Sequence, residues 1–272
     1  MNENDDRYDF YSLQYARFSG DLAAEIRREV YESDIGQQGW RTLEEQDDIT
    51  ALVGERPSCR FLDVACGSGG PSLETVRTVT GCRLTGVDIE AAGIAEANDR
   101  AVAMGLTDCA EFLVADCSEP LPFDDSTFDV VVCIDAVPHF ADRNRVFRDW
   151  FRLLSPGGRL FLTDAAVLTG AVSRAELDVR ASQGCFVSVP PGFNETSLSQ
   201  AGFRLLKQVD TTNATADIAN RTFAARRRRE KALRQAEGAE WFEKRQAFLA
   251  TTADLAASRR LSRFRYIAEK SA

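Results

Sequence analysis

The segment at positions 61–70, FLDVACGSGG, constrains the fold of this chain more than any other stretch. Its apolar first half predicts a β-strand. Its glycines predict a tight loop, because glycine tolerates positive φ angles and lets the backbone approach a ligand closely. Pro71 suits the start of a helix, where its missing N–H costs little. The segment therefore predicts a strand, a glycine-rich loop and a helix, which together form the first unit of an α/β sheet.

A second short strand, at positions 82–88, ends in the carboxylate of Asp88. From position 67 to position 88 the chain advances by 21 residues, which is the length of one strand–helix–strand unit. A carboxylate at this strand end can accept hydrogen bonds from both hydroxyls of a ribose. Together the two segments predict a nucleoside-binding site on an α/β sheet.

The loop departs from two common phosphate-binding motifs. The dinucleotide motif G-x-G-x-x-G requires a third glycine, and Ser72 occupies that position. The P-loop motif G-x-x-x-x-G-K-[ST] does not occur in the sequence. Neither motif therefore explains the loop.

The pattern that does match has an acid, a small residue and two glycines at alternate positions: Asp63, Ala65, Gly67 and Gly69. It resembles motif I of the class I S-adenosylmethionine (SAM) dependent methyltransferases, with Ala65 in place of the first glycine usual in that family. Further segments typical of the family follow in order and at its spacing. They are a strand at 111–115 followed by Asp116 and Cys117, an apolar strand at 128–135, and a Pro-Gly-Gly turn at 156–158 before a fifth strand.

The resemblance covers residues 58–165 most firmly, and it implies both a fold and a cofactor. The implied fold is α/β: a Rossmann-like, seven-stranded, mostly parallel sheet with helices on both faces, an N-terminal helical lid and a helical cap. The implied cofactor is S-adenosyl-L-methionine, and the product is S-adenosyl-L-homocysteine (SAH). Within the family, the chain is most similar to bacterial small-molecule methyltransferases.

The resemblance also implies which residues hold the cofactor. Asp88 is expected to accept from the ribose, and Asp116 to reach the adenine amine beside Cys117. Asp63 and Asp135 are expected near the ammonium or the positive sulfonium. For each acid the alternative is a helix cap or a surface charge. The full set of expected contacts is Asp63, Ala65, Gly67, Ser68, Gly69, Asp88, Ile89, Asp116, Cys117 and Asp135, with Gln38 and Trp40 from the lid.

We expect a single methyltransferase domain over residues 1–272, built from three parts. Residues 1–57 form the lid, 58–165 the SAM-binding core, and 166–272 the cap and the last two strands, with a helical insertion at about 215–258 between those strands. A lid would expel water and hold donor and acceptor in line. The alternative for residues 1–57 is an ordinary capping helix with core aromatics.

The acceptor is expected to be an N or O atom of a small metabolite, in specialised metabolism. The only histidine, His139, follows the apolar strand that ends at Asp135. Ligands bind beyond the carboxyl ends of such strands, so His139 is the candidate general base. Its alternative is a structural histidine. Tyr11 and Tyr15 are candidates for orienting the acceptor.

Composition limits the partners. The 33 basic and 42 acidic side chains give a net charge of −9, which argues against nucleic acid, because nucleic-acid binding usually requires a basic surface. Arg226–Arg229 is the densest basic run, and consecutive residues wrap around a helix, so a solvated or ion-paired helix is expected there. There is no apolar run of 18 residues, and no membrane span is expected.

The seven cysteines show no CxxC spacing and no pairing pattern. The number of cysteines is odd, and the first residues are polar and acidic, unlike a secretory signal. Both features predict free thiols in a reducing cytoplasm. One histidine and no clustered thiols predict that no metal is bound. The sequence leaves the oligomeric state and the acceptor open.

Three alternatives to methyl transfer on a metabolite remain. A SAM-binding enzyme could carry out other chemistry on the cofactor, such as intramolecular cyclisation or an elimination that releases methylthioadenosine. A nucleic-acid methyltransferase could use Arg226–Arg229. A non-catalytic SAM sensor is the third.

Overall fold

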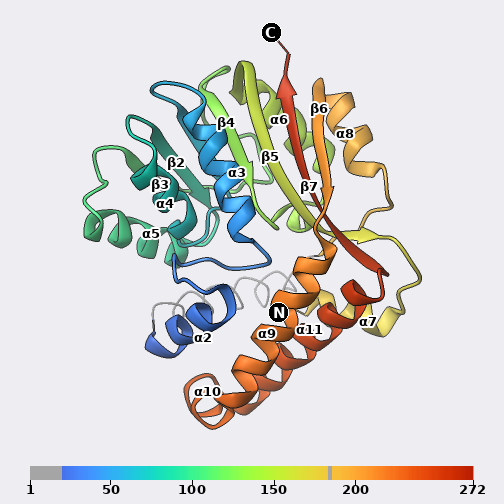
Figure 1. Ribbon diagram of the computed structural model, residues 1–272. Coiled ribbons are helices and arrows are strands. Elements are labelled where there is room, and N and C mark those ends of the chain that lie inside the picture. Colours follow the sequence, from blue (N-terminus) through green and yellow to red (C-terminus); the bar gives the residue numbers. More distant parts are fainter. Residues whose placement is uncertain (1–19, 183–185, 272) are drawn as a thin grey trace, which may run out of the picture.

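A computed structural model of the chain describes residues 20–182 and 186–271. Seven strands in this part form one sheet in the order β3-β2-β1-β4-β5-β7-β6 (Figure 1). The strands are β1 (Arg60–Val64), β2 (Arg83–Asp88), β3 (Ala110–Val114), β4 (Phe128–Cys133), β5 (Leu154–Leu168), β6 (Phe203–Asp210) and β7 (Leu261–Lys270).

The sheet is parallel apart from one strand. β1 pairs in parallel with β2 and β4, β2 with β3, and β4 with β5. β7 lies between β5 and β6 and runs antiparallel to both. The predicted fold class, a mostly parallel seven-stranded Rossmann-like sheet, is confirmed.

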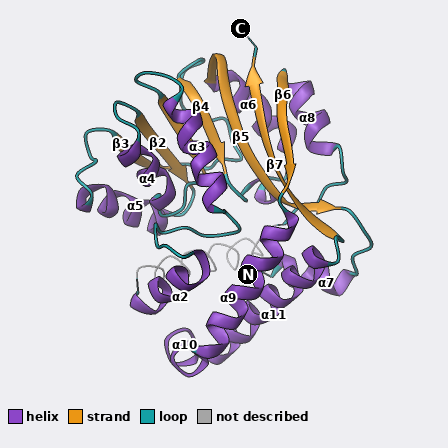
Figure 2. Ribbon diagram, in the orientation of Figure 1, coloured by secondary structure: helices purple, strands orange, loops and turns teal. Residues whose placement is uncertain are grey.

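Alternating apolar residues give the sheet two buried faces, because successive side chains of a strand point to opposite sides. In β1, Phe61 belongs to one buried cluster and Leu62 to the other; in β4, Val132 and Val131 divide in the same way. One cluster packs under α3 (Leu43–Gly54), α4 (Gly70–Thr78) and α5 (Ala91–Ala103), and the other under α6 (Arg143–Leu153) and α8 (Phe193–Ala201). Helices therefore cover both faces, as expected (Figure 2).

The glycine-rich loop turns sharply into α4. Gly69 has a φ of +67°, and a side chain there would meet the ring of Phe112 at 2.6 Å. The helix then begins at Gly70, so Pro71 occupies its first turn and needs no hydrogen bond from its nitrogen. Only glycine fits at position 69, and this fixes the loop at the end of β1.

The remaining helices gather at one end of the sheet (Figure 1). They are α2 (Asp21–Tyr31), α7 (Arg174–Ala181), α9 (Thr212–Arg228), α10 (Glu230–Glu237) and α11 (Ala239–Ala257). Helices α9 to α11 lie between β6 and β7 in the chain, at the predicted insertion. A third buried cluster joins α2, Trp40 and these three helices. We refer to α7 and α9–α11 as the cap.

None of the helices in residues 20–182 and 186–271 has the length and apolar character needed to cross a lipid bilayer. A short 3-10 helix, η1 (Val137–His139), follows β4. The six cysteines in the described part are free thiols.

Candidate functional site

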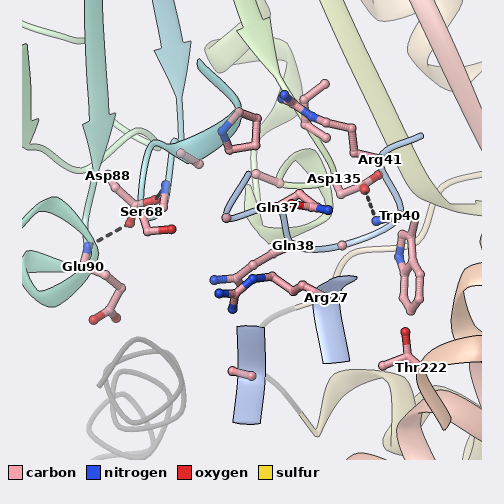
Figure 3. Close-up of a pocket in the computed structure, with 18 of the residues that line it drawn as sticks. Arg27, Gln37, Gln38, Trp40, Arg41, Ser68, Asp88, Glu90, Asp135 and Thr222 are labelled. Carbon is pink, nitrogen blue, oxygen red and sulfur yellow. Dashed lines mark hydrogen bonds between the residues drawn. The ribbon is translucent and has the colours of Figure 1, made fainter. Parts of the chain in front are cut away.

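A cavity of about 1090 Å³ lies where the carboxyl ends of the strands face the cap. Its walls come from the loop after β1, the ends of β2 and β4, α2 and the segment after it, and the cap helices. Figure 3 shows part of this wall, with Asp88 and Glu90 at one side of the view and Asp135 and Arg41 at the other. The cavity therefore occupies the place where open α/β sheets bind ligands.

Asp88 ends β2 and ties the glycine-rich loop to the strand. Its Oδ2 accepts from the backbone N–H of Gly67 at 2.8 Å, and its Oδ1 accepts from that of Glu90 at 2.9 Å. Burial raises the pKa of its carboxyl. Each carboxylate oxygen can accept a second hydrogen bond, so Asp88 retains capacity for ligand hydroxyls on the cavity wall.

The loop after β1 holds a left-handed conformation at three positions. The φ angles are +56° at Ala65, +57° at Gly67 and +67° at Gly69. A non-glycine residue in this region carries strain of about 1–2 kcal/mol. Ala65 thus stands where glycine would be relaxed, which explains why glycine is usual at this position of the motif. Ser68, between the two glycines, is buried and lines the cavity.

Asp63, near the end of β1, is a buried acid on the cavity wall. Ser72 donates a short hydrogen bond to it. Burial raises the pKa of its carboxyl to about 6, while the positive charge of Arg41 opposes that rise. Burial therefore makes the charged carboxylate costly, and a ligand cation would offset that cost.

Two further predicted contacts lie after β3. Asp116 is exposed on the cavity wall, and its Oδ1 accepts from the backbone N–H of Ser118 at 2.9 Å and from its hydroxyl at 2.6 Å. Cys117 is buried beside it, and burial raises the pKa of its thiol to about 12. Ile89, after Asp88, also lines the cavity. The structure thus brings these residues to one wall.

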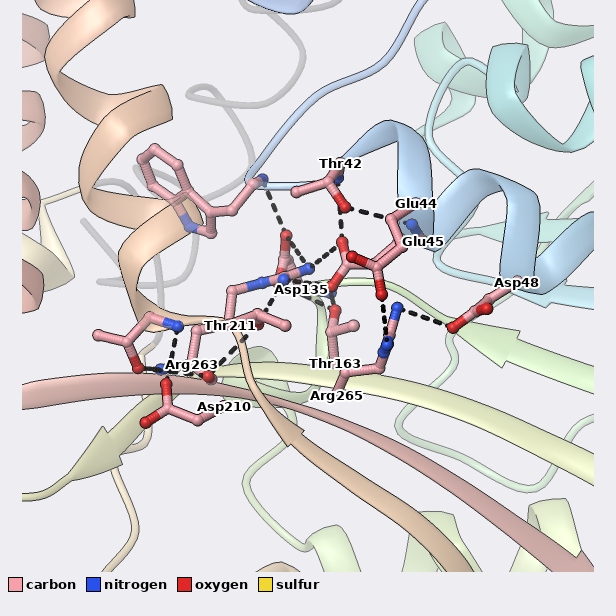
Figure 4. A network of polar contacts seen from close by, with 12 residues as sticks. Thr42, Glu44, Glu45, Asp48, Asp135, Thr163, Asp210, Thr211, Arg263 and Arg265 are labelled. Carbon is pink, nitrogen blue, oxygen red and sulfur yellow. Dashed lines mark hydrogen bonds and ion pairs between the residues drawn. The ribbon is translucent and has the colours of Figure 1, made fainter.

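Asp135 lines the cavity, but the protein itself binds its carboxylate. Asp135 Oδ2 accepts from the backbone N–H of Trp40 at 2.9 Å, and Oδ1 accepts from Nε of Arg263 at 2.7 Å and from the hydroxyl of Thr163 at 3.0 Å. Its φ is +57°. Figure 4 shows these contacts converging on one carboxylate. Direct contact of Asp135 with a ligand stays a prediction.

Arg263 of β7 connects this carboxylate to α3. It is fully buried, and its Nη1 and Nη2 donate to the two oxygens of Glu45 at 2.5 and 3.1 Å. Glu45 also closes the N-terminus of α3, where Thr42 caps the helix. Sequence analysis did not identify Arg263. The only indication was that two arginines, Arg263 and Arg265, interrupt the apolar residues of the last strand.

The segment between α2 and α3 supplies the predicted lid contacts. Gln38 and Trp40 both line the cavity. The indole of Trp40 stacks on Phe248 of α11 with ring centroids 6.3 Å apart. This segment therefore contacts both the sheet, through Asp135, and the cap.

His139 ends η1 and faces the cavity from the sheet side. Its ring meets that of Phe186 edge-on, with centroids 6.1 Å apart. The guanidinium of Arg180 lies over Phe186 and Phe248, 4.5 and 4.6 Å from their centroids. His139 thus lies beside Phe186 on the cavity wall, while Tyr11 and Tyr15 fall outside the described residues.

The strand ends contribute most of the acids on the cavity wall, which are Asp63, Asp88, Glu90, Asp116 and Asp135. The cap contributes Arg180, Arg226, Arg245 and the acid Glu237, and residues 21–41 add Asp21, Arg27 and Arg41. The strand side therefore suits a cationic ligand. Among the described residues, no group of three or more His, Cys, Asp or Glu side chains could hold a metal ion.

The fold and this wall define a class of protein: a Rossmann-like α/β protein with a nucleoside site beyond β1, β2 and β3. Comparison with known proteins identifies the family. A family model described as "Methyltransferase domain" matches residues 62–162.

The 27-O-demethylrifamycin SV methyltransferase of Amycolatopsis mediterranei is 30% identical over 236 residues, which are 81% of this chain and 85% of the relative. The chain therefore belongs to the SAM-dependent methyltransferase family. The predicted family, enzymatic activity and cofactor are confirmed. Matches to further methyltransferases are shorter and span, for example, 43%, 63% and 24% of those proteins.

Solved structures share the fold. The cyclopropane synthase MmaA2 from Mycobacterium tuberculosis superposes with a TM-score of 0.80 at 18% identity, over 97% of this chain and 98% of that one. The [4+2]-cyclase SpnF superposes with a TM-score of 0.72 at 22% identity, over 97% and 95% of the two chains. At these identities the likeness shows the fold alone.

The site residues fit SAM. Asp88 has acceptor capacity for ribose hydroxyls, the loop has the left-handed turns that a close ligand needs, and the acidic strand ends suit a sulfonium and an ammonium. The individual contacts remain predictions.

Proposed function

We propose that the enzyme transfers the methyl group of SAM to an oxygen or nitrogen atom of a small metabolite in specialised metabolism. The observation that carries this proposal is the single cavity shared by the cofactor loop and the cap. Ligand cavities usually hold about 300–1,000 Å³, so about 1090 Å³ has room for SAM and a second molecule.

The chemistry of the cavity supports a metabolite acceptor. When bound, SAM supplies an electrophilic methyl group on a positive sulfur. Phe248 of the cap, together with Trp40 and Phe186 from neighbouring loops, offers apolar surface on the cavity wall. His139 stands where it can accept a proton from a hydroxyl acceptor. The rifamycin relative is named for an O-methylation of a small molecule, which agrees with this proposal.

A lid role for the segment from α2 to α3 belongs to the same proposal. Trp40 contacts Asp135 on the sheet and Phe248 on the cap, so this segment closes one side of the cavity. A closed cavity excludes water and orients the acceptor, which is the main service that methyl transfer requires. We further propose a cytoplasmic location, which the free thiols support.

The arginine run does not favour a nucleic-acid substrate. Arg226 pairs with Glu237, Arg227 with Glu230 at 2.9 Å, Arg228 with Glu29, and Arg229 with Glu29 at 2.7 Å. These pairs neutralise the run within the protein. A basic nucleic-acid surface would need unsatisfied cations.

The test is product analysis. Purified enzyme, SAM and a panel of hydroxylated and aminated small molecules are incubated, and the products are separated by mass spectrometry. SAH formed together with an acceptor heavier by one methylene unit supports the proposal. Methylthioadenosine would instead show cleavage at another carbon, and bound SAM without any turnover would indicate a sensor. If RNA or DNA added to the same assay were methylated instead, the acceptor would be a nucleic acid and the proposed metabolite acceptor would be wrong.

A further inference from the structure

Arg226 and Glu237 form a buried ion pair in the cap, on the wall of the cavity. Their side chains are 10% and 7% exposed, and they come from α9 and α10 (Figure 1). Burial lowers the pKa of the guanidinium, whereas the negative charge of Glu237 opposes that change. Withdrawing two charges from water is costly, and well-packed apolar side chains often stabilise a protein equally well. Stability alone therefore does not explain a pair at this position.

The protein holds one side of the pair in place. Nη2 of Arg226 donates to Oε1 of Glu237, and Nε donates to Oε1 of Gln246 at 3.3 Å. The guanidinium also lies over the ring of Phe242, 5.5 Å from its centroid. Neither side chain of the pair forms a further hydrogen bond with a residue in the described part of the chain. Nη1 of Arg226 therefore keeps the capacity to donate, and Oε2 of Glu237 keeps the capacity to accept.

The surroundings of the pair on the cavity wall are apolar. Leu233, Trp241 and Phe248 line the cavity from α10 and α11. Leu233 and Phe248 are also part of the buried cluster that the cap shares with α2. Ligand pockets combine such an apolar lining with a few polar groups that fix the orientation of the ligand. Arg226 and Glu237 are placed to be these polar groups on the cap side of the cavity.

The two charges of the pair restrict the chemistry of a ligand group that can bind there. Arg226 would attract an anion but Glu237 would repel it, and a cation would meet the reverse. An uncharged group that has an acceptor oxygen beside an N–H or O–H donor can satisfy both side chains at once. A carboxamide is such a group, because its oxygen can accept from the guanidinium while its N–H donates to the carboxylate. Both hydrogen bonds would involve a charged partner, which makes them stronger than neutral ones.

We propose that Arg226 and Glu237 form a recognition site for the methyl acceptor, and that this acceptor carries an uncharged group with a donor beside an acceptor oxygen, as in a carboxamide. The inference rests on the proposed function, because it takes the cap section of the cavity as the acceptor wall. The pair would hold a part of the acceptor other than the atom that receives the methyl group, and so would contribute to specificity.

Binding of three probes to the enzyme saturated with SAH tests the proposal without any methyl transfer. The probes share a naphthalene ring and differ in one substituent. 2-Naphthamide has a donor and an acceptor, methyl 2-naphthoate has acceptor oxygens only, and 2-naphthoate is an anion. Ligand-observed NMR titrations measure the three affinities. The wild-type enzyme should bind the amide roughly tenfold more tightly than the ester or the anion.

The double substitution Arg226→Met/Glu237→Met removes both charges and leaves apolar surface in their place. It should weaken binding of the amide about tenfold and change binding of the ester by less than about twofold. Arg227→Met/Glu230→Met is the matched control, because that ion pair joins the same two helices at 51% and 34% exposure and neither residue lines the cavity. The control should change no affinity by more than about twofold.

Glu237→Gln separates recognition from a structural contribution. With Oε1 still bound to Arg226, the side chain presents an N–H donor in place of an accepting oxygen, so the preference should shift from the amide to the ester. Equal wild-type affinities for amide and ester, tighter binding of the anion, or no measurable binding of the amide would each overturn the proposal.

A preference for the amide that survives Glu237→Gln would also overturn it, and this variant decides if the double variant does not fold. These titrations involve no turnover, so a product assay that finds no methylated metabolite would leave their results unchanged. Conversely, loss of this recognition site would leave the proposed methyl transfer to a metabolite standing.

Discussion

Asp63 is a buried acid whose charge lowers the stability of the folded protein at neutral pH. Burial raises the pKa of its carboxyl from 3.8 to about 6, so the folded protein holds this proton more tightly than the unfolded chain does. Stability then falls as the pH rises from about 4 to 6, and the full cost is present at pH 7. The same negative charge would attract the ammonium or sulfonium group that the sequence analysis expects near Asp63.

We expect Asp63→Asn to raise the free energy of unfolding at pH 7 by about 1–3 kcal/mol, because the amide carries no charge and can still accept from Ser72. Urea titrations of the unliganded proteins at pH 4 and pH 7 measure the effect, and the gain should vanish at pH 4. The same variant should bind SAH more weakly. Wild-type affinity should also decrease as the pH drops below about 6. A variant that is less stable at pH 7 would contradict this account.

His139 is the residue-scale test of proton removal. His139→Gln should lower kcat about 10²–10⁴-fold for a hydroxyl acceptor, while the Kd of SAH changes little, since the proposed role of His139 is contact with the acceptor. Initial rates over a range of pH, together with calorimetry on SAH, separate the two effects. A parallel loss of SAH affinity would indicate a structural role instead, and unchanged rates would leave the reaction without this base.

At the scale of elements, the Arg263–Glu45–Asp135 network joins β7, α3 and the end of β4. The guanidinium and the carboxylate of Glu45 are buried and that of Asp135 is mostly buried, so removing Arg263 leaves uncompensated charge. We expect Arg263→Leu to lower the free energy of unfolding by about 3–5 kcal/mol, measured by chemical denaturation.

The control for that prediction is Arg174→Leu, which breaks an ion pair between side chains that are 88% and 60% exposed. Exposed pairs contribute about 0–1 kcal/mol, so this variant should remain near wild type. If both substitutions lowered the free energy of unfolding equally, burial would not explain the contribution of Arg263 to stability.

The strands and the cofactor loop were predictable because their determinants are local. Apolar runs such as 128–135, and glycines at the loop, need no knowledge of distant residues. The predicted wall residues, among them Asp88 and Asp116, lie at strand ends, and parallel strands bring their carboxyl ends to one edge. These residues line a common cavity because of that topology, although their contacts with SAM stay predictions.

The role of Arg263 was not predictable, for the opposite reason. It depends on a partner far away in the chain, because Arg263 meets Glu45 across 218 residues. Arg263 belongs to no local motif. The engagement of the Asp135 carboxylate by Trp40 and Arg263 is equally nonlocal, and sequence alone suggested only that this acid faced the cofactor.

At the scale of the whole molecule, we propose one cooperative domain, as expected from the sequence. Trp40 belongs to the buried cluster under the cap and Trp150 to a cluster under the sheet. Tryptophan fluorescence and circular dichroism should therefore report a single coincident thermal transition. SAH at about 100 times its Kd should raise the free energy of unfolding by about 2.7 kcal/mol, which corresponds to a rise in Tm of roughly 5–10 °C. Asp88→Ala should abolish most of that rise in Tm. Separate transitions for the two probes would contradict a single cooperative domain.

The ends of the cap insertion lie side by side in the sheet. β6 ends at Asp210, whose partner in β7 is Phe264, and the backbone N–H of Thr211 donates to the carbonyl of Arg263 at 2.9 Å. Helices α9 to α11 thus leave the sheet and return to it at nearly one point. Recombination after Asp210, where β6 ends, and before Leu261, where β7 begins, would graft the helices of another enzyme of this fold without interrupting a strand. Under the proposed function, such a chimera would have the acceptor specificity of the enzyme that supplied the helices and the cofactor binding of this one.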